Sequence, residues 1–198
     1  FNNQAIPHEI SKYKQQRFLD NQVIKISYGM KPLKEKYRKE AVPAMQGLFH
    51  YKSPMAVPAI VKVTLNTGIG RIVAGKSSEE QKKIAQDVAE DLSLIAGQKA
   101  VPTLAKKSIA SFKSRQGMPI GVKVTLRGQR MYDFLDRLIH IVLPRSRDFQ
   151  GLDGKSLDKK GNMSIGIKEH IFFPEISPEK VKHMIGLEIT VTTSAHTR

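Results

Sequence analysis

Residues 57–70 read VPAIVKVTLNTGIG, and the pattern of this stretch decides the class of fold. The residues from Val57 to Asn66 alternate between an apolar set and a mixed set: Val57, Ala59, Val61, Val63 and Leu65 against Ile60, Lys62, Thr64 and Asn66. A period of two is typical of a strand that buries one face. The stretch therefore predicts a half-buried strand that ends in the turn Gly68-Ile69-Gly70.

A helix is predicted directly after this strand. Ser77 stands three residues before Glu80, which is the spacing of a capping box at the start of a helix. Apolar residues then recur on one helical face, and Gly97 follows the last of them: Ile84, Val88, Leu92 and Ile95. The pattern indicates an amphipathic helix that packs one face on the strand and ends at Gly97.

The rest of the chain supplies further elements at irregular intervals. The sequence predicts a helix from Leu33 through Phe49 that Pro43 kinks or delays, a strand from Ile120 to Arg127, a helix over 131–142 stopped by Pro144, and strands over 164–173 and 187–193. Long loops are expected at 98–119 and 144–162. A doubly wound parallel sheet would need regular crossovers. We therefore expect an α+β fold, with a mainly antiparallel sheet of four or five strands, helices on one face, and the other face open for a ligand.

Composition limits the kind of partner. The 198 residues include 33 Lys and Arg against 18 Asp and Glu, for a net charge of +15, and no cysteine. Such a surplus favours nucleic acid or an anionic membrane surface. Disulfides and thiolate metal sites are excluded, and no apolar run is long enough to span a bilayer. With 40% apolar residues, we expect one core over 33–198, preceded by a basic extension over 1–32.

The positive charge is concentrated in the middle of the chain. Between Asp91 and Asp133 there is no acidic residue, but there are eight basic ones: Lys99, Lys106, Lys107, Lys113, Arg115, Lys123, Arg127 and Arg130. A loop over 106–118 adds serines and Phe112, on which a base could stack. A merely solvated basic loop is the alternative. Because Lys123 and Arg127 extend the charge along the polar face of the neighbouring predicted strand, the pattern favours an RNA surface.

Residues 70–77, GRIVAGKS, match the phosphate-binding pattern G-x-x-x-x-G-K-[ST]. In that interpretation, Lys76 would reach the terminal phosphates and Ser77 would ligate magnesium in a nucleotide-binding enzyme. Such an enzyme also needs a second buried strand ending in an acidic residue, and no predicted strand ends in one. The β-branched pair Ile72-Val73 fits poorly in a loop that wraps around phosphates. Nucleotide binding by Gly70–Ser77 is therefore kept as the weaker alternative.

No other chemistry is indicated. The six histidines are scattered, without the spacing of a metal site, and no serine lies in a nucleophile elbow. The sequence therefore predicts neither an enzyme nor a cofactor.

Several stretches together carry a resemblance to a known family. The stretches are 57–70, AGQK (96–99), KKSIASFK (106–113), GMPIG (117–121), VTLRG (124–128), PRSRDFQG (144–151), GIKEH (166–170) and FPEI (173–176). In this order they resemble the bacterial-type L-five family of large-subunit ribosomal proteins, over about residues 33–193. The resemblance covers a far longer part of the sequence than the eight-residue phosphate-loop match.

The resemblance implies a curved antiparallel sheet backed by helices, in a structural protein of the central protuberance. The implied partners are large-subunit rRNA, 5S rRNA, the P-site tRNA, and neighbouring ribosomal proteins including one of the small-subunit head. Carried over by position, the implied rRNA-binding residues are Asn66, Thr67, Gly68, Lys123 and Arg127. The implied tRNA-facing loop holds Lys106, Lys107, Ser108, Phe112, Lys113 and Arg115.

Two features depart from the family pattern. The family continues into another helix after the segment that matches Thr193, whereas this sequence stops at Arg198. Residues 1–32 have no counterpart in bacterial members, and Phe1 in place of Met suggests a removed leader. The resemblance therefore favours a mitochondrial ribosome in the matrix, with a chloroplast or the bacterial cytoplasm as alternatives. Some mitochondrial ribosomes lack 5S rRNA, so that partner stays open.

Overall fold

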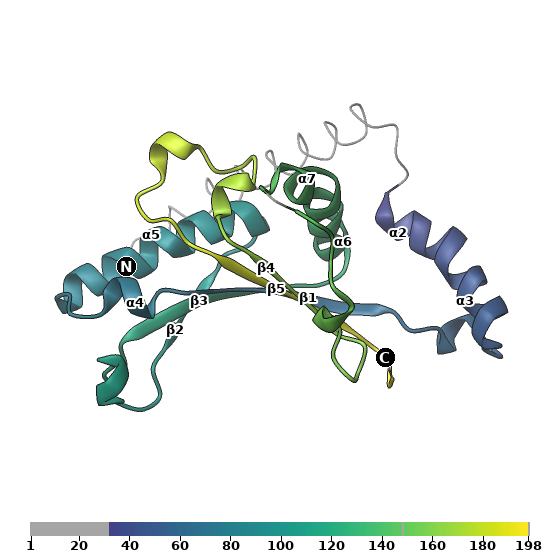
Figure 1. The fold of residues 1–198 in the computed structure, drawn as a ribbon, viewed down its shortest axis with the longest axis horizontal. Coiled ribbons are helices and arrows are strands. Elements are labelled where there is room, and N and C mark those ends of the chain that lie inside the picture. The colour runs from purple at the N-terminus through teal and green to yellow at the C-terminus, as the bar shows by residue number, and fades with distance from the viewer. Residues whose placement is uncertain (1–31, 148, 198) are drawn as a thin grey trace, which may run out of the picture.

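The computed structural model describes residues 32–147 and 149–197, which form a five-stranded sheet with helices on one face (Figure 1). The strands are β1 (Ile60–Gly68), β2 (Val101–Leu104), β3 (Pro119–Leu126), β4 (Met163–Ile167) and β5 (Leu187–Thr193). Their order is β2-β3-β1-β5-β4, and every neighbouring pair is antiparallel. The predicted α+β class is confirmed. The basic extension falls almost wholly outside the described residues.

Two long helical segments cover the core face of the sheet. They are α5 (Ser78–Ala96) and the run formed by α6 (Gln129–Arg137), the π-turn η4 (Leu138–Val142) and α7 (Leu143–Arg145). Short elements complete the fold: α4 (Gly70–Val73) and the 3-10 turns η2 (Pro54–Ala56), η3 (Ala110–Phe112), η5 (Gly154–Ser156), η6 (His170–Phe172) and η7 (Pro178–Lys180). The core includes Val63 and Leu65 of β1, Leu92 of α5 and Phe134 of α6, whose ring stacks on Phe173.

A helical arm precedes β1 and extends beyond one end of the sheet (Figure 1). It consists of α2 (Leu33–Lys36), the π-turn η1 (Tyr37–Ala41) and α3 (Val42–Phe49). The Leu33 backbone N–H donates to Asp136 Oδ2 at 3.2 Å, and the Tyr37 hydroxyl donates to the Pro58 carbonyl at 3.0 Å. These two bonds fasten the arm to α6 and to the chain that enters β1.

Two helical segments contain a proline just after a π-turn: Pro43 in α3 follows η1, and Pro144 in α7 follows η4. The Val42 N–H bonds the Tyr37 carbonyl just before Pro43, and the Leu143 N–H bonds the Leu138 carbonyl just before Pro144. A proline ring in an α-helix clashes with the carbonyl four residues earlier. The wider π-turn accommodates the ring in both places. Pro43 therefore neither delays the helix nor breaks it, and the later helix continues one residue past Pro144.

A bulge in β1 changes which residues its buried face contains. The pairing of β1 with β5 shifts register between Ile60 and Lys62. Val63 and Leu65 point into the core as predicted, but Val61 is exposed. The strict alternation expected from Val57 onward is therefore wrong before Lys62, because a bulged residue leaves the alternation of the strand.

Two other strand predictions need correction. The expected loop over 98–119 contains β2. This strand was not predicted because it includes Pro102, and proline is rare inside strands. The strand predicted over 164–173 ends at Ile167, where its ladder with β5 ends at Leu187. The chain then turns through η6, and the His170 N–H bonds the Ile185 carbonyl. The strand predicted over 187–193 is confirmed.

The predicted capping box is present at the start of α5. The Ser77 hydroxyl accepts from the Glu80 N–H, and Glu80 Oε2 accepts from the Ser77 N–H at 3.1 Å. Gly97 follows the helix with a φ of 62°, a left-handed conformation that glycine adopts without strain. In the described part of the chain, no helix has the length and apolarity needed to cross a membrane.

Candidate nucleic-acid interface

The sheet face opposite the helices is polar and accessible. One row of exposed residues crosses all five strands, each residue facing the next in register: Val101, Lys123, Asn66, Glu188 and Gly166. The next row carries four hydroxyls, from Thr125, Thr64, Thr190 and Ser164. We call these two rows the open face. It offers amide, ammonium and hydroxyl groups and the carboxylate of Glu188, and it lacks a side chain at Gly166.

The open face holds two of the predicted rRNA-binding residues, Asn66 of β1 and Lys123 of β3. Asn66 and Lys123 are cross-strand partners and are both exposed, so their side chains lie together. Gly68 lies at the same face at the end of β1, and a Cβ added there would meet nothing within 4 Å. No part of the described chain therefore requires glycine at this position.

Thr67 differs from the other predicted rRNA-binding residues. Its side chain points into the core, only 2% of the residue is exposed, and its hydroxyl donates to the Gly186 carbonyl at 2.7 Å. The alternation of β1 places it on the opposite face from Asn66. Thr67 therefore ties β1 to the start of β5, and a contact to RNA through its side chain is excluded in this conformation.

Arg127 opens onto a small cavity at the end of β3. The cavity has a volume of about 440 Å³ and is lined by Gln98, Thr125, Arg127, Gln129 and Arg130. Gln98 Nε2 donates to the Thr125 carbonyl at 3.2 Å, and an Arg130 guanidinium N–H donates to Gln98 Oε1 at 3.1 Å. Sequence reasoning missed Gln98 and Thr125 as site residues. Only the position of Gln98 within the AGQK motif pointed to it.

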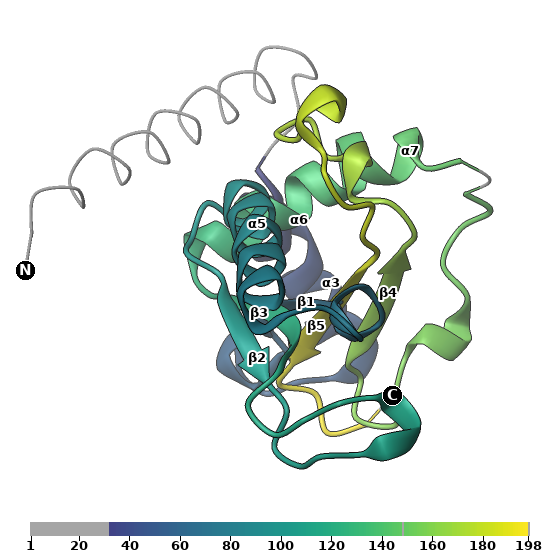
Figure 2. The ribbon, with the colours of Figure 1, turned by 90° about the vertical axis from the view of Figure 1, so that its left-hand side faces the viewer.

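The predicted tRNA-facing loop is the end of a hairpin formed by β2 and β3. The Ala105 N–H donates to the Met118 carbonyl at 2.8 Å, and the Ile109 and Ser114 backbones exchange two bonds of 3.0 and 3.2 Å. The Ser108 hydroxyl accepts from the Gln116 N–H at 2.9 Å. These bonds give the loop a defined path away from the sheet (Figure 2).

The basic residues of this loop point into solvent, as predicted. Lys106, Lys107, Lys113 and Arg115 are all exposed. Phe112 is 74% exposed, and Lys113 follows it with a φ of 51°, in the left-handed region. An exposed aromatic ring between cations can stack on a base while the cations contact phosphates.

The phosphate-loop interpretation of Gly70–Ser77 fails on local geometry. Residues Gly70–Val73 form the short helix α4 in place of a loop that wraps around phosphates. The start of α5 is already occupied by the Glu80 carboxylate, and the two hydrogen bonds from Ser77 lower its pKa and keep it charged. An incoming phosphate would therefore meet a negative charge. Nothing supports the alternative of a nucleotide-binding enzyme.

His170 and Asp91 are titratable residues that lie close together at the core. His170 is fully buried, its Nδ1 accepts from the Ile185 N–H at 3.4 Å, and its Nε2 lies 3.8 Å from Asp91 Oδ2. Burial lowers the pKa of His170 and raises that of Asp91. Within residues 32–147 and 149–197, no three His, Asp or Glu side chains are grouped so that they could hold a metal ion.

Comparisons with known proteins agree with this architecture. Residues 53–115 match the family model of ribosomal protein L5, and residues 119–198 match the model of the C-terminus of the same ribosomal family. The chain is 50% identical over 168 residues to the large ribosomal subunit protein uL5 of Thermoanaerobacter sp. (strain X514), and the match covers 85% of this chain and 90% of that protein. The chain therefore belongs to the ribosomal protein L5 family, whose members are structural, non-enzymatic constituents of the large ribosomal subunit.

Proposed function

We propose that the open face is the surface through which this chain binds rRNA in the central protuberance, including 5S rRNA in ribosomes that contain it. The observation that carries the proposal is the uncovered row in which Asn66 and Lys123 lie side by side, next to a row of hydroxyls. Helical RNA presents phosphates and 2′-hydroxyls, which proteins recognise mainly by shape and polar contacts.

Each proposed group has a distinct role. Lys123 and Arg127 contact phosphates, while Asn66 and Thr125 exchange hydrogen bonds with ribose or base edges. Gly68 lets the RNA backbone approach the end of β1, because nothing projects from the sheet there. The cavity beside Arg127 receives a group that reaches the Gln98 amide.

We further propose that the hairpin loop contacts the P-site tRNA, with Lys106, Lys107, Lys113 and Arg115 at phosphates and Phe112 at a base. The support is their common exposure at the end of a hairpin that leads away from the open face. A contact with a protein of the small-subunit head rests on the family resemblance and stays a prediction.

Domain organisation and location are also proposals. Residues 33–198 act as one rRNA-binding domain, and the support is a single sheet that takes its strands from both matched segments, 53–115 and 119–198. The predicted mitochondrial location rests on residues 1–32 and stays a prediction, since the bacterial relative fits the bacterial alternative as well. Immunodetection of the protein in large subunits purified from mitochondria and from cytoplasm distinguishes the two.

The open face is tested by binding of labelled rRNA fragments from the central protuberance to the full chain. Lys123→Ala should weaken binding several-fold and reduce the slope of log affinity against log salt by roughly 0.7–0.9, as expected for one lost phosphate contact. Asn66→Ala should weaken binding without changing that slope. Lys83→Ala on α5 also removes an exposed charge, but on the helical side, and is the matched control. Equal losses from Lys123→Ala and Lys83→Ala would refute the proposal.

A further inference from the structure

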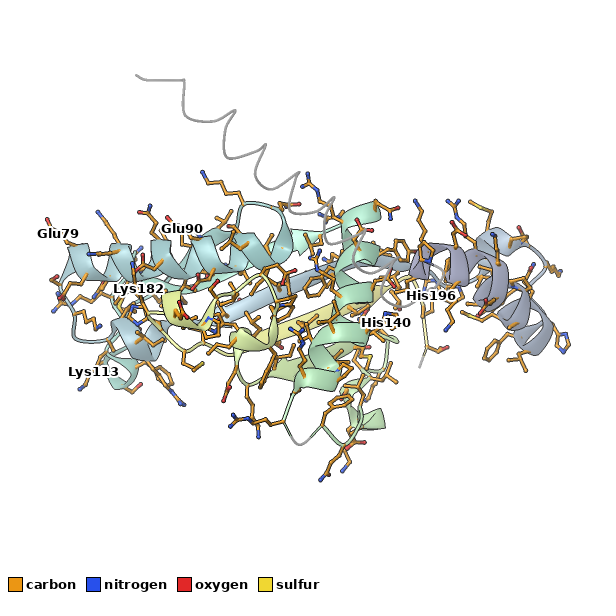
Figure 3. All side chains as sticks on the ribbon, turned by 90° about the horizontal axis from the view of Figure 1, so that it is seen from above. Glu79, Glu90, Lys113, His140, Lys182 and His196 are labelled. Atoms are coloured by element: carbon orange, nitrogen blue, oxygen red, sulfur yellow. The ribbon has the colours of Figure 1, made fainter. Side chains whose placement is uncertain are left out.

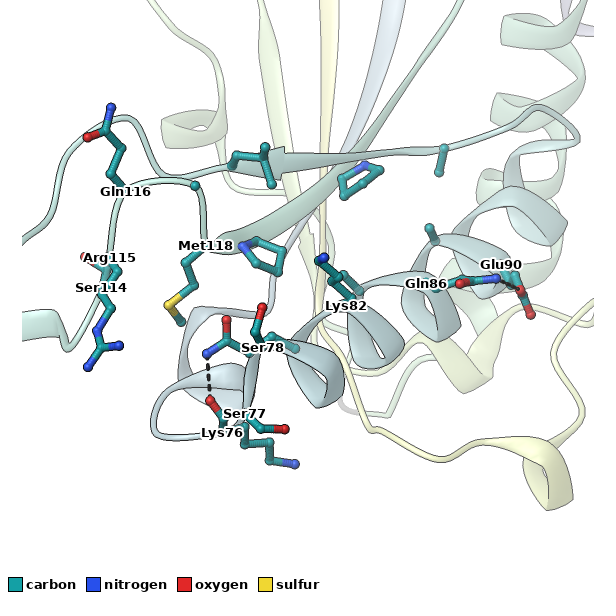
Figure 4. A pocket seen from close by; sticks show the side chains of 18 of the residues that line it. Lys76, Ser77, Ser78, Lys82, Gln86, Glu90, Ser114, Arg115, Gln116 and Met118 are labelled. Atoms are coloured by element: carbon teal, nitrogen blue, oxygen red, sulfur yellow. Dashed lines mark hydrogen bonds between the residues drawn. The ribbon is translucent and has the colours of Figure 1, made fainter.

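A second depression lies on the other side of the sheet from the open face. It has a volume of about 1720 Å³ and runs between α5 and the hairpin of β2 and β3 (Figure 4). We call it the α5 groove. Its floor includes Ala85 and Ala89 of α5 and Pro102 and Leu104 of β2, and Leu104 is 57% exposed. The groove exists because α5 packs mainly over β3 and covers little of the outer strand β2.

Both walls of the α5 groove are positively charged. The residues that line it include six cations and a single acid, Glu90: Lys76, Lys82, Lys99, Lys113, Arg115 and Arg130. Among the described residues, no carboxylate pairs with Lys82, Lys99, Lys113 or Arg115. Unneutralised cations that face one another across a groove favour an anionic occupant.

Size and hydrogen-bonding groups narrow the choice of occupant. Small-molecule sites occupy about 300–1,000 Å³, so the α5 groove suits a polymer better than a metabolite. Four glutamines line it, namely Gln81, Gln86, Gln98 and Gln116. Amide side chains both donate and accept, and they match the edges of bases and the hydroxyls of ribose. Nε2 of Gln81 already donates to the Lys76 carbonyl, Nε2 of Gln86 to Glu90 and Nε2 of Gln98 to the Thr125 carbonyl, so the Gln116 amide is the most available of the four.

A peptide that adds a strand to β2 is disfavoured. Pro102 lies in the middle of this edge strand and has no N–H to donate. The Ala100 N–H is already bonded to the Ser93 hydroxyl at 2.8 Å. The chain's own extension is also a poor occupant, because it is basic like the groove.

We infer that the α5 groove binds a strand of single-stranded RNA, with phosphates at the cations of both walls and bases toward the glutamines and the apolar floor. The inference rests on the proposed rRNA-binding function and adds a second surface, on the opposite side of the sheet. Gln98 and Arg130 line both the groove and the cavity beside Arg127, so the two surfaces meet at the end of β3.

The test uses the full chain and a short fluorescent oligouridine strand that carries 4-thiouridine. After irradiation, crosslinked peptides should come from residues 76–93 and 99–119. Lys82→Glu should weaken binding about tenfold at low salt and lower the salt slope by roughly 0.7. Lys83→Glu is the matched control, because Lys83 is the next residue of the same helix but does not line the groove.

Four outcomes would overturn the inference. Equal weakening by Lys82→Glu and Lys83→Glu would indicate general electrostatic attraction. Displacement of the RNA by polyglutamate at equal charge concentration would indicate an acidic protein segment as the occupant. Crosslinks confined to β1 and β5 would assign the oligouridine to the open face. Absence of oligouridine binding by the unaltered chain, with Lys123-dependent rRNA binding retained, would also refute the groove but would leave the proposed function standing.

Discussion

The Nε atom of Arg137 lies 2.9 Å from Oε1 of Glu175, and the two side chains are only 8% and 3% exposed. A second guanidinium nitrogen of Arg137 donates to the Ile95 carbonyl at 2.9 Å. One side chain of α6 thereby joins the last turn of α5 to the segment that follows Phe173. Removing one member of a close, buried ion pair is strongly destabilising in general.

Glu175→Ala should therefore lower the free energy of unfolding by about 3–5 kcal/mol. Guanidinium titration followed by circular dichroism measures the change. The exposed pair formed by Lys182 and Asp87, with N–O distances of 3.0 and 3.1 Å, is the matched control; Lys182 is labelled in Figure 3. Lys182→Ala should cost less than about 1 kcal/mol, because surface pairs contribute little. A similar cost for both variants would contradict the role given to burial.

Gly121→Ala should destabilise the sheet strongly. A Cβ at residue 121 would lie 2.8 Å from the Thr67 carbonyl oxygen and 2.9 Å from Thr103 Oγ1, so β1 or β2 would have to shift. The cost should be about 1–3 kcal/mol, the range for overpacked sites. Gly68, its cross-strand partner, has open space and is the control. Gly68→Ala should leave the unfolding midpoint nearly unchanged but weaken rRNA binding.

Ser77→Ala should lower the free energy of unfolding by about 0.5–2 kcal/mol, because it removes the cap of α5. For a domain of this size, 1 kcal/mol corresponds to a loss of about 2–4 °C in Tm. Differential scanning fluorimetry measures it. Ser78→Ala, one residue into the helix, should change Tm much less. A Tm unaffected by Ser77→Ala would show that the capping box does not stabilise α5.

Stability should decline as pH falls below about 6.5, the ordinary pKa of histidine, because of His170. Burial lowers the pKa of His170, so below pH 6.5 the unfolded chain binds more protons than the folded chain, and acid favours unfolding. Burial raises the pKa of Asp91, which acts in the opposite direction at more acidic pH. His170→Gln should flatten the change in urea midpoint between pH 7.5 and 5.5. An unchanged slope in this variant would rule out His170 as the cause.

Replacing both Lys113 and Arg115 by Ala should weaken tRNA contact on assembled subunits without altering the fold. Both residues are exposed, and surface substitutions usually change stability by less than about 0.5 kcal/mol. Footprinting of P-site tRNA measures the contact, and thermal unfolding of the isolated chain measures the fold. Unfolding of the double variant would show that the hairpin loop supports the core.

Elements whose sequence pattern is contained in the element itself could be predicted from the sequence. The strand over 187–193 alternates without interruption, and the cap of α5 needs only Ser77 and Glu80. The missed features depend on a partner distant in sequence. The bulge at Ile60 is a property of the β1–β5 ladder, and β2 forms because β3 offers it a partner despite Pro102.

In the candidate site, too, local features could be predicted, whereas features that depend on distant residues could not. The position of the positive charge could be predicted from the absence of acidic residues between Asp91 and Asp133. Sequence alone could not assign Thr67 to the core, because the predicted end of the strand at Asn66 left its face undefined. Nor could it bring Gln98 next to Thr125, since the fold joins them across 27 positions.

The two π-turns fix the lengths of the helices that contain them. Each turn holds one residue more than α-helical geometry needs, and its proline follows two positions later. Deleting one residue within Leu138–Val142 would return this turn to α-helical geometry, and the ring of Pro144 would then clash with the carbonyl four residues earlier. These helices therefore tolerate substitution at their exposed positions far better than a change in the number of their residues.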